Sequence, residues 1–254
     1  MFWETELGKG RPGWHIECSA MSMATLGEQL DIHTGGVDNM FPHHENEIAQ
    51  SEGATGKPFA RYWMHNEWVL MDSEKMSKSL KNFYTVEDLI KKGINPLSYR
   101  FWLLMAHYRS RMNLVFEALE GAQTALKRLY RLYLALGEEM GKVDDKYRQK
   151  FKEHLENDLD TPRALSTLWD LIKDENVSEA DKKATILDFD KALGLGFEDL
   201  KEDEIPSEII KLAEEREEAR KNKDYKKSDE LRDKINSMGY EVKDSEDGYK
   251  INIL

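Results

Sequence analysis

Lys75-Met76-Ser77-Lys78-Ser79 is the segment from which the rest of the chain can be placed, because it stands between a hydrophobic run, Tyr62 to Met71, and a helical pattern that begins near Thr85. Its two ammonium groups are three residues apart and can both face one polyphosphate, since lysine carries a compact charge on a flexible stem. The hydroxyls of Ser77 and Ser79 can bond phosphate oxygens or cap the helix that follows. A solvated loop is the alternative, but the complete pentapeptide between a strand and a helix favours phosphate binding.

The bulk composition limits the class of protein. The chain has 254 residues, enough for one large domain or two to three small ones, and 34% of them are charged. No apolar run approaches a membrane span and no signal peptide opens the chain, so we expect a cytoplasmic protein without a membrane partner. Cys18 is the lone cysteine, which excludes an internal disulfide. The formal charge of −12 argues against indiscriminate nucleic-acid binding but allows a shaped RNA partner met by local basic patches.

Hydrophobic periodicity predicts an α/β fold followed by mainly α structure. After a loop at residues 1–13, helices alternate with strands, as in a parallel α/β sheet, and Tyr62 to Met71 is predicted as a single strand. Ser207 to Met238 is predicted as one long charged helix before a C-terminal hairpin that turns at Asp247-Gly248. In order, the predicted parts are the α/β part at 1–72, the lysine loop and its connection at 73–95, a helical bundle at 96–197 and a small helix-plus-hairpin domain at 205–254.

Cys18, His43 and Glu47 form a candidate metal site. His43 and Glu47 are four residues apart on a helix that we expect Pro42 to open, so they share one face. Cys18 adds a soft thiolate from an earlier element, and thiolate, imidazole and carboxylate together suit zinc. The alternative is that Cys18 is a plain core residue, as lone buried cysteines usually are. The adjacent His44 points off the shared face and is assigned a supporting or structural role.

The sequence around these residues closely resembles that of the cysteinyl-tRNA synthetase family, which belongs to the class I aminoacyl-tRNA synthetases. The K-M-S-K-S loop is a signature of class I enzymes in general, whereas the G-W-H-I-E-C-S-A-M block is specific to this family among them. The resemblance reaches the last helix and covers essentially the whole chain. Its blocks are Gly13 to Met21, Gly35 to Asp38 and Phe41 to Ser51, followed by Asn157 to Pro162, Glu214 to Arg216, Ala219 to Lys221 and Asp229 to Arg232.

The resemblance implies a partial Rossmann-like catalytic domain at the start of the chain and a role for each motif. Three of these residues also have a purely structural interpretation. Trp14 could be a core aromatic, His15 a structural histidine, and Asp38 a turn residue after the glycine pair. The implied residues are Cys18, His43 and Glu47 for zinc, Trp14 and His15 for the amino acid, Asp38, Lys75, Met76, Ser77, Lys78 and Ser79 for ATP, and Lys75 and Lys78 for stabilising charge during catalysis.

The function implied by the resemblance is that of a cysteine–tRNA ligase, with L-cysteine, ATP with magnesium, and tRNA(Cys) as partners. Two family features are missing, a His-Ile-Gly-His-type ATP signature and a further cysteine zinc ligand. We therefore expect the chain to correspond to the C-terminal portion and to need a separate N-terminal half for activity. Lys81, where the family usually has glycine, is a smaller departure that changes the backbone freedom of the loop or adds a phosphate contact.

Three other functions remain open from the sequence. A zinc- and ATP-dependent cysteine ligase of the mycothiol-synthesis type shares the metal and loop motifs but lacks the region from Ser207 to Leu254. A non-catalytic tRNA-binding fragment and a simple zinc-binding helical protein are the others. Basic residues that could contact RNA, with a solvated surface as the stronger alternative for the last helix, are Arg100, His107, Arg109, Arg111, Lys127, Arg128 and Arg131, then Lys221, Lys223, Lys226 and Lys227.

Overall fold

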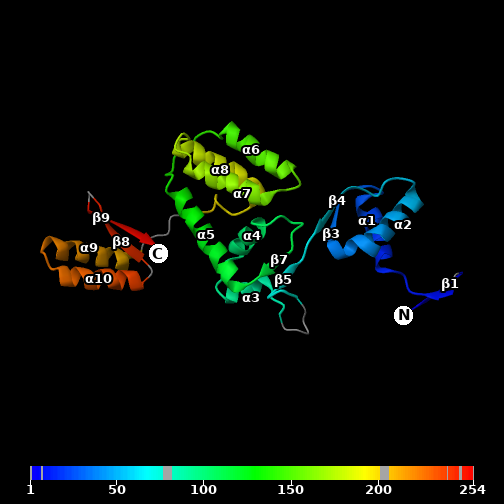
Figure 1. Cartoon of the computed structure of the whole chain (residues 1–254), viewed down its shortest axis with the longest axis horizontal. Helices are drawn as coiled ribbons and strands as arrows, with labels where there is room; N and C mark the ends of the chain where they lie inside the picture. The colour runs from blue at the N-terminus through cyan, green and yellow to red at the C-terminus, as the bar shows by residue number, and fades with distance from the viewer. Residues whose placement is uncertain are drawn as a thin grey trace. The chain divides into compact units, whose positions relative to one another are not determined.

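The computed structural model describes residues 2–6, 8–76, 82–200, 206–238, 240–245 and 248–253. The chain divides into two compact units, Met1–Leu200 and Lys201–Leu254, and each is described by itself. The predicted class, α/β followed by mainly α, is confirmed (Figure 1). No helix among the described residues is both long and apolar enough to cross a membrane. The predicted parts at 1–72, 73–95 and 96–197 all fall in the first unit, and their boundaries stay predictions.

The first unit opens with α/β structure around a parallel strand pair. Strand β3 pairs with β4 in parallel, with His33 opposite Trp63 and Gly35 opposite His65. Residues 1–13 were expected to be a loop, but β1 and β2 form a small antiparallel ladder there. The helix expected from Pro42 begins only at Glu45, because Phe41 has non-helical backbone angles inside the preceding π-helical turn. The elements are β1 (Trp3–Thr5), β2 (Gly8–Gly10), α1 (Trp14–Leu26), β3 (Leu30–Gly36), η1 (Val37–Asn39), η2 (Met40–His44), α2 (Glu45–Thr55) and β4 (Ala60–Asn66).

The strand predicted from Tyr62 to Met71 is two strands, because the chain changes partners between them. Up to Asn66 it pairs with β3, whereas the backbone N–H of Glu67 donates to the carbonyl of Tyr108 at 2.9 Å, and β5 then pairs in parallel with β7. Thr85 begins the next helix with a reciprocal capping box to Asp88, so the helix carries its own cap. The elements are β5 (Val69–Met71), β6 (Glu74–Lys75), α3 (Val86–Lys91) and β7 (Met112–Leu114), in the sheet order β6-β5-β7.

The helical bundle holds the large apolar core of the first unit. Leu126 and Leu129 of α5, Leu168 of α7 and Phe189 of α8 are essentially inaccessible to solvent. Asp160 and Ser178 are the N-caps at which α7 and α8 begin, and their side chains accept from backbone N–H groups of the first turn. The helices, seen side by side in Figure 1, are α4 (Pro96–Leu104), α5 (Phe116–Leu134), α6 (Asp145–Glu156), α7 (Thr161–Lys173) and α8 (Glu179–Leu193).

The second unit is a helical hairpin with a two-stranded ladder, so the prediction of one long helix from Ser207 to Met238 is wrong. Lys223 adopts a left-handed φ of 59°, and the Asp224 side chain accepts from the backbone N–H of Lys227 at 3.1 Å, which starts a new helix. The reversal lets Ile209 pack against Ile235 in a small buried core. The predicted C-terminal hairpin is confirmed, although Asp247 of its turn lies outside the described residues. The elements are α9 (Ser207–Lys221), α10 (Tyr225–Ser237), β8 (Tyr240–Ser245) and β9 (Gly248–Ile253).

Candidate functional site

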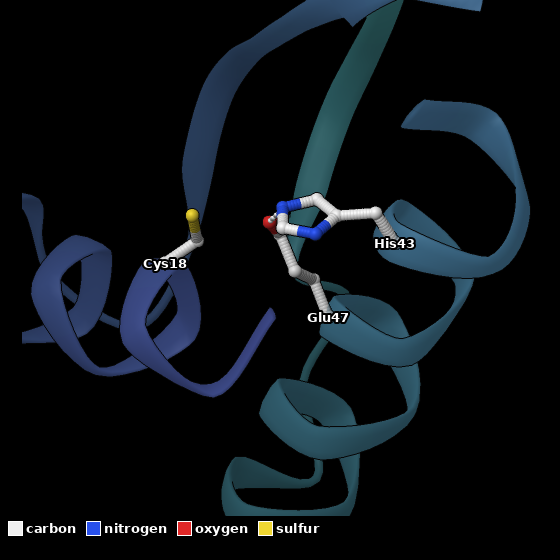
Figure 2. A group of neighbouring side chains, drawn as sticks. All are labelled: Cys18, His43 and Glu47. Atoms are coloured by element: carbon white, nitrogen blue, oxygen red, sulfur yellow. Dashed lines mark ion pairs between the residues drawn. The ribbon is translucent and has the colours of Figure 1, made fainter. Parts of the chain in front are cut away.

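The structure brings Cys18, His43 and Glu47 together from three elements. Cys18 comes from α1, His43 from η2 and Glu47 from the first turn of α2, and Figure 2 shows the three side chains directed toward one another. One ligand atom from each lies within 4.8 Å of the others. The Nε2 atom of His43 is 2.7 Å from Oε1 of Glu47. The set therefore has the compactness that a single metal ion requires.

Glu47 is the most buried member of this set and the least well satisfied. Its side chain is fully buried, and its Oε2 lies 2.7 Å from Nε2 of His33. Both contacts are within ion-pair distance, yet neither carboxylate oxygen has a hydrogen-bond partner of acceptable geometry among the described residues. Burying a charged carboxylate without such partners lowers the stability of the folded state, because the desolvation free energy is not compensated. The donor set and this orphaned carboxylate together fit a cation held between Glu47, His43 and Cys18.

The thiol of Cys18 fits the same interpretation. Burial, and after it the negative charge of Glu47, raises the pKa of the Cys18 thiol above its ordinary value. A bound cation reverses this preference because it stabilises the thiolate directly. Sulfur, nitrogen and oxygen ligands in one tight group are the combination that zinc accepts.

A cluster of histidines lies beside the candidate metal ligands Cys18, His43 and Glu47, which are called the metal group below. Its members His33 and His65 were not predicted from the sequence. His44, which was assigned a supporting role, is buried, and its Nδ1 lies 2.7 Å from Nε2 of His65. Burial, then the neighbouring His33, lowers the pKa of His44 to about 4. Burial, then Arg109, also lowers the pKa of His65. Both shifts favour the neutral imidazole, and donor atoms of His33, His44 and Glu47 form a second close group.

The strand register explains why this cluster exists. His33 lies opposite Trp63 and Gly35 opposite His65, so alternate residues of the two paired strands meet on one face. Gly35 is required for this packing, since a Cβ atom there would lie 2.6 Å from Cε1 of His44. Period-two alternation gives the face of each strand on which His33 and His65 lie, but the register that brings them together is not specified by it.

Trp14 and His15 lie beside the metal group at the start of α1. The Trp14 ring centre is 4.4 Å from that of His43, and the His15 ring meets His43 edge-on at 6.4 Å. Trp14 is 63% exposed, which excludes the alternative of a core aromatic. Gly13 makes room for His15, because a Cβ atom at Gly13 would overlap the imidazole. The two rings thus border the metal group where it opens to solvent.

The nucleotide candidates Asp38 and Lys75 both contact the indole of Trp68, a residue that was not predicted from the sequence. The indole N–H of Trp68 donates to Oδ1 of Asp38 at 3.1 Å. The Nζ of Lys75 lies 4.1 Å from the centre of the same indole. Met76 packs partly buried against the main apolar core. The other members of the loop, Ser77, Lys78 and Ser79, and the neighbouring Lys81 lie outside the described residues.

The basic candidates between residues 100 and 111 are engaged within the chain. Arg109 donates through two nitrogens to the carboxylate of Asp158, at 2.7 and 3.2 Å, and His107 lies 2.8 Å from the carbonyl of the same residue. Arg100 donates to the carbonyl of Leu193 at 2.5 Å. Arg111 forms an ion pair with Glu67 at 3.3 Å. The exposed candidates on helices are Lys127, Arg128 and Arg131 on α5, Lys221 on α9 and Lys226 and Lys227 on α10, with Lys223 exposed between α9 and α10.

Comparisons with known proteins agree with this geometry. Residues 1–124 match a family model described as the class I (C) tRNA synthetase catalytic domain, and residues 202–250 match the cysteinyl-tRNA ligase anticodon-binding domain. A cysteine–tRNA ligase of Chlamydia muridarum is 42% identical over 99% of this chain and 58% of its own length. Those of Caldicellulosiruptor saccharolyticus and Finegoldia magna are 43% and 44% identical over 58% and 57% of their lengths.

A solved structure with the same fold is the agnB2 LeuRS of Agrobacterium radiobacter K84, in a ternary complex with tRNA and LeuAMS. Its TM-score is 0.54 at 13% identity, over 77% of this chain and 32% of that one. The described part of this chain thus shares the fold of part of a class I synthetase. The chain spans less than two thirds of the length of the curated relatives named above.

Proposed function

The chain belongs to the cysteinyl-tRNA synthetase family, and from this premise we propose that it carries the metal-binding and lysine-loop part of a cysteine–tRNA ligase. In the proposed reaction the carboxylate of L-cysteine attacks the α-phosphate of ATP, pyrophosphate leaves, and the cysteinyl group passes to the terminal adenosine of tRNA(Cys). We propose further that activity needs the His-Ile-Gly-His-type segment of the family, which this sequence does not contain.

The observation that carries the proposal is the buried carboxylate of Glu47, which lies beside His43 and Cys18 and has no hydrogen bond of acceptable geometry to the described residues. These three side chains would hold zinc, which when bound supplies a thiophilic centre that distinguishes cysteine from serine. Selectivity that depends on one strong polar contact can reach about 10⁴–10⁵, enough to make a separate editing step unnecessary. Trp14 and His15 border this group and would shield the substrate side chain from water.

The lysine loop serves the phosphate end of the same reaction. Lys75 and Asp38 contact the same side chain, the indole of Trp68. We assign Asp38 to the ribose or adenosine of ATP, and Lys75 and Lys78, with magnesium, to its phosphates. The lysines act by positioning the triphosphate and stabilising the charge that develops as pyrophosphate leaves, and they transfer no proton.

The acceptor of the cysteinyl group is proposed to be tRNA and not a small amino sugar. The match of residues 202–250 to an anticodon-binding domain supports this choice. The exposed lysines of the second unit, Lys221, Lys223, Lys226 and Lys227, are proposed as backbone contacts to the RNA.

The test is cysteine-dependent exchange between ATP and pyrophosphate with zinc present. It is run on the chain alone and on the chain mixed with the N-terminal half of a family member. Exchange in the mixture alone is the expected result, and charging of tRNA(Cys) should follow the same pattern. Exchange by the chain alone would contradict the need for a second half. No exchange in either sample would sink the ligase and favour a tRNA-binding fragment.

A matched pair of variants ties the test to the metal group. Glu47→Gln keeps the shape of the side chain but removes its charge, and it should abolish exchange in the mixture. Glu45→Gln makes the same chemical change in the same helical turn at an exposed position, and it should leave exchange unchanged. Equal rates for the two variants would separate Glu47 from the reaction.

A further inference from the structure

Trp68 lies in the turn between β4 and β5 and touches both described residues that we assign to the nucleotide. Its indole N–H donates to the Asp38 carboxylate at 3.1 Å, while the ammonium of Lys75 sits 4.1 Å from the ring centre. A cation within about 6 Å of an indole centroid is attracted by the negative face of the ring. One side chain thus holds an anion at its edge and a cation on its face.

The backbone around Trp68 fixes this arrangement. The carbonyl of Trp68 accepts from the backbone N–H of Met112 at 3.1 Å, which ties the backbone at Trp68 to the start of β7. A Cβ atom at Gly36 would lie 2.5 Å from Oδ1 of Asp38, so only glycine leaves the carboxylate free to reach the indole. The carbonyl of Lys75 accepts from the side-chain amide of Asn82 at 3.3 Å, which braces the start of the lysine loop.

A second cation lies beside the same ring. The guanidinium carbon of Arg111 is 5.9 Å from the centre of the Trp68 indole, and Arg111 is itself paired with Glu67. The indole therefore keeps one cationic neighbour when another leaves. Among the described residues, the ammonium of Lys75 contacts the indole ring and forms no ion pair that would hold it there.

We infer that Trp68 is a positioning residue with two separable actions: its N–H orients Asp38, and its ring holds the Lys75 ammonium in a parked position until a polyphosphate takes its place as the partner of Lys75. A polyphosphate carries several negative charges and attracts an ammonium more strongly than a ring quadrupole does. In the parked position the Lys75 ammonium stays on the same indole that orients Asp38. The nucleotide part of this inference rests on the proposed function.

The parked position is tested by ¹³C-methylation of the lysines and NMR of the whole chain, with the Lys75 signal assigned through Lys75→Arg. We expect the Lys75 signal to be shifted by the indole ring current, to lose that shift in Trp68→Leu and to keep part of it in Trp68→Phe. Inorganic pyrophosphate should move the signal to the unshifted position. Lys92, whose ammonium lies 4.7 Å from the Phe116 ring centre, is the internal control and should respond to neither change.

An unshifted Lys75 signal in the unmodified protein would overturn the parking. A signal that stays shifted throughout the pyrophosphate titration would overturn its release. Neither result depends on catalysis. The parked position of Lys75 can therefore be supported when the ligase proposal fails, and it can be rejected when the ligase proposal is supported.

The action on Asp38 is tested in the exchange assay with the mixed halves. Trp68→Phe loses the N–H donor and keeps a ring, so the KM for ATP should rise about two- to tenfold, as expected for one hydrogen bond, while the KM for cysteine is unchanged. Trp169→Phe on α7 makes the same substitution in the bundle and should change neither constant. A rise in both KM values, or a loss of kcat alone, would show a structural effect and overturn the assignment.

Discussion

The region up to Asn66 and the helical bundle bury opposite kinds of side chains. Among the described residues up to Asn66, the buried apolar side chains are those of Leu30 and Phe59, whereas Ser19, His44, Glu47 and Ser51 are buried polar ones. The bundle instead encloses a continuous cluster of leucine, phenylalanine and other apolar residues. Apolar burial stabilises without further help, but a buried carboxylate needs a partner. We therefore expect the bundle to be stable by itself and the stability of the site region to depend on the proposed metal ion.

The largest expected effect is in the bundle. Phe189 of α8 is fully buried and stacks on Phe151 of α6 with ring centres 4.0 Å apart. Phe189→Ala should lower the free energy of unfolding by about 3–5 kcal/mol, because it removes apolar burial and leaves a cavity. Urea denaturation measures the loss, and hydrogen exchange should accelerate in α6 and α8 but not in α2.

An exposed phenylalanine is the control for this substitution. Phe83 is 48% exposed, and Phe83→Ala should change the stability by no more than about 0.5 kcal/mol. Exchange in α2 that rises as much as exchange in α8 would show that the two regions unfold together, which would break the contrast between them.

Removing the metal should act on the other region. Treatment of the zinc-loaded chain with a chelator is expected to accelerate hydrogen exchange in α1 and α2 and to leave α7 and α8 unchanged. Glu47→Gln should weaken zinc binding at least about tenfold, since it removes a charged ligand, whereas Glu45→Gln should leave it unchanged. Competition with a chromophoric chelator measures both affinities, and equal affinities would contradict the assigned site.

A smaller effect is expected from crowding the histidine cluster. Gly35→Ala places a methyl group against the buried ring of His44, which should cost about 1–3 kcal/mol of stability and lower the zinc affinity. Gly53→Ala, in the interior of α2 with nothing within 4 Å of the new carbon, should instead stabilise the helix by about 0.5–1 kcal/mol. Thermal unfolding distinguishes the two, and a harmless Gly35→Ala would mean that the cluster is loosely packed.

The smallest effect concerns a polar contact on the surface of the bundle. Hydrogen bonds from Arg109, then Tyr108, hold the pKa of Asp158 below its usual range. Because the folded pKa lies below the unfolded value of about 3.9, the stabilisation is complete above that pH and is lost as the pH falls through the folded pKa. Asp158→Asn should therefore lower the melting temperature slightly near pH 7, and this difference should shrink on acidification below about pH 4.

Salt and a second variant provide the control for Asp158. The pair is half exposed, so added salt should weaken its contribution. Asp170→Asn, which removes a single exposed ion pair to Lys150, should have a smaller effect. A difference between Asp158→Asn and the unmodified protein that persists in strong acid would assign the effect to shape and not to charge.

The spacing of residues along the chain predicted the pair His43 and Glu47, whereas the positions of His33 and His65 depend on the register of two strands. Glu47 follows His43 by four residues, so one helical turn suffices to bring them together even though α2 begins after His43. His33 and His65 join them only because β3 pairs with β4 in one register, which no local pattern specifies. Trp68 was likewise not predicted, because its position depends on the point at which the chain stops pairing with β3 and begins to pair with β7. The unbroken charge pattern of the last helix concealed the break at Lys223, because a single capping aspartate, Asp224, outweighs helix propensity there.

The way the bundle helices follow one another in the chain also sets an order of events in time. Helices α6, α7 and α8 are consecutive in sequence and share one core, and structures built from such local contacts form on the order of microseconds to milliseconds. The site instead joins α1, β3, α2 and β4 through polar groups that gain little until a cation arrives. We therefore expect the capture of a metal ion at the proposed site to follow the folding of the bundle.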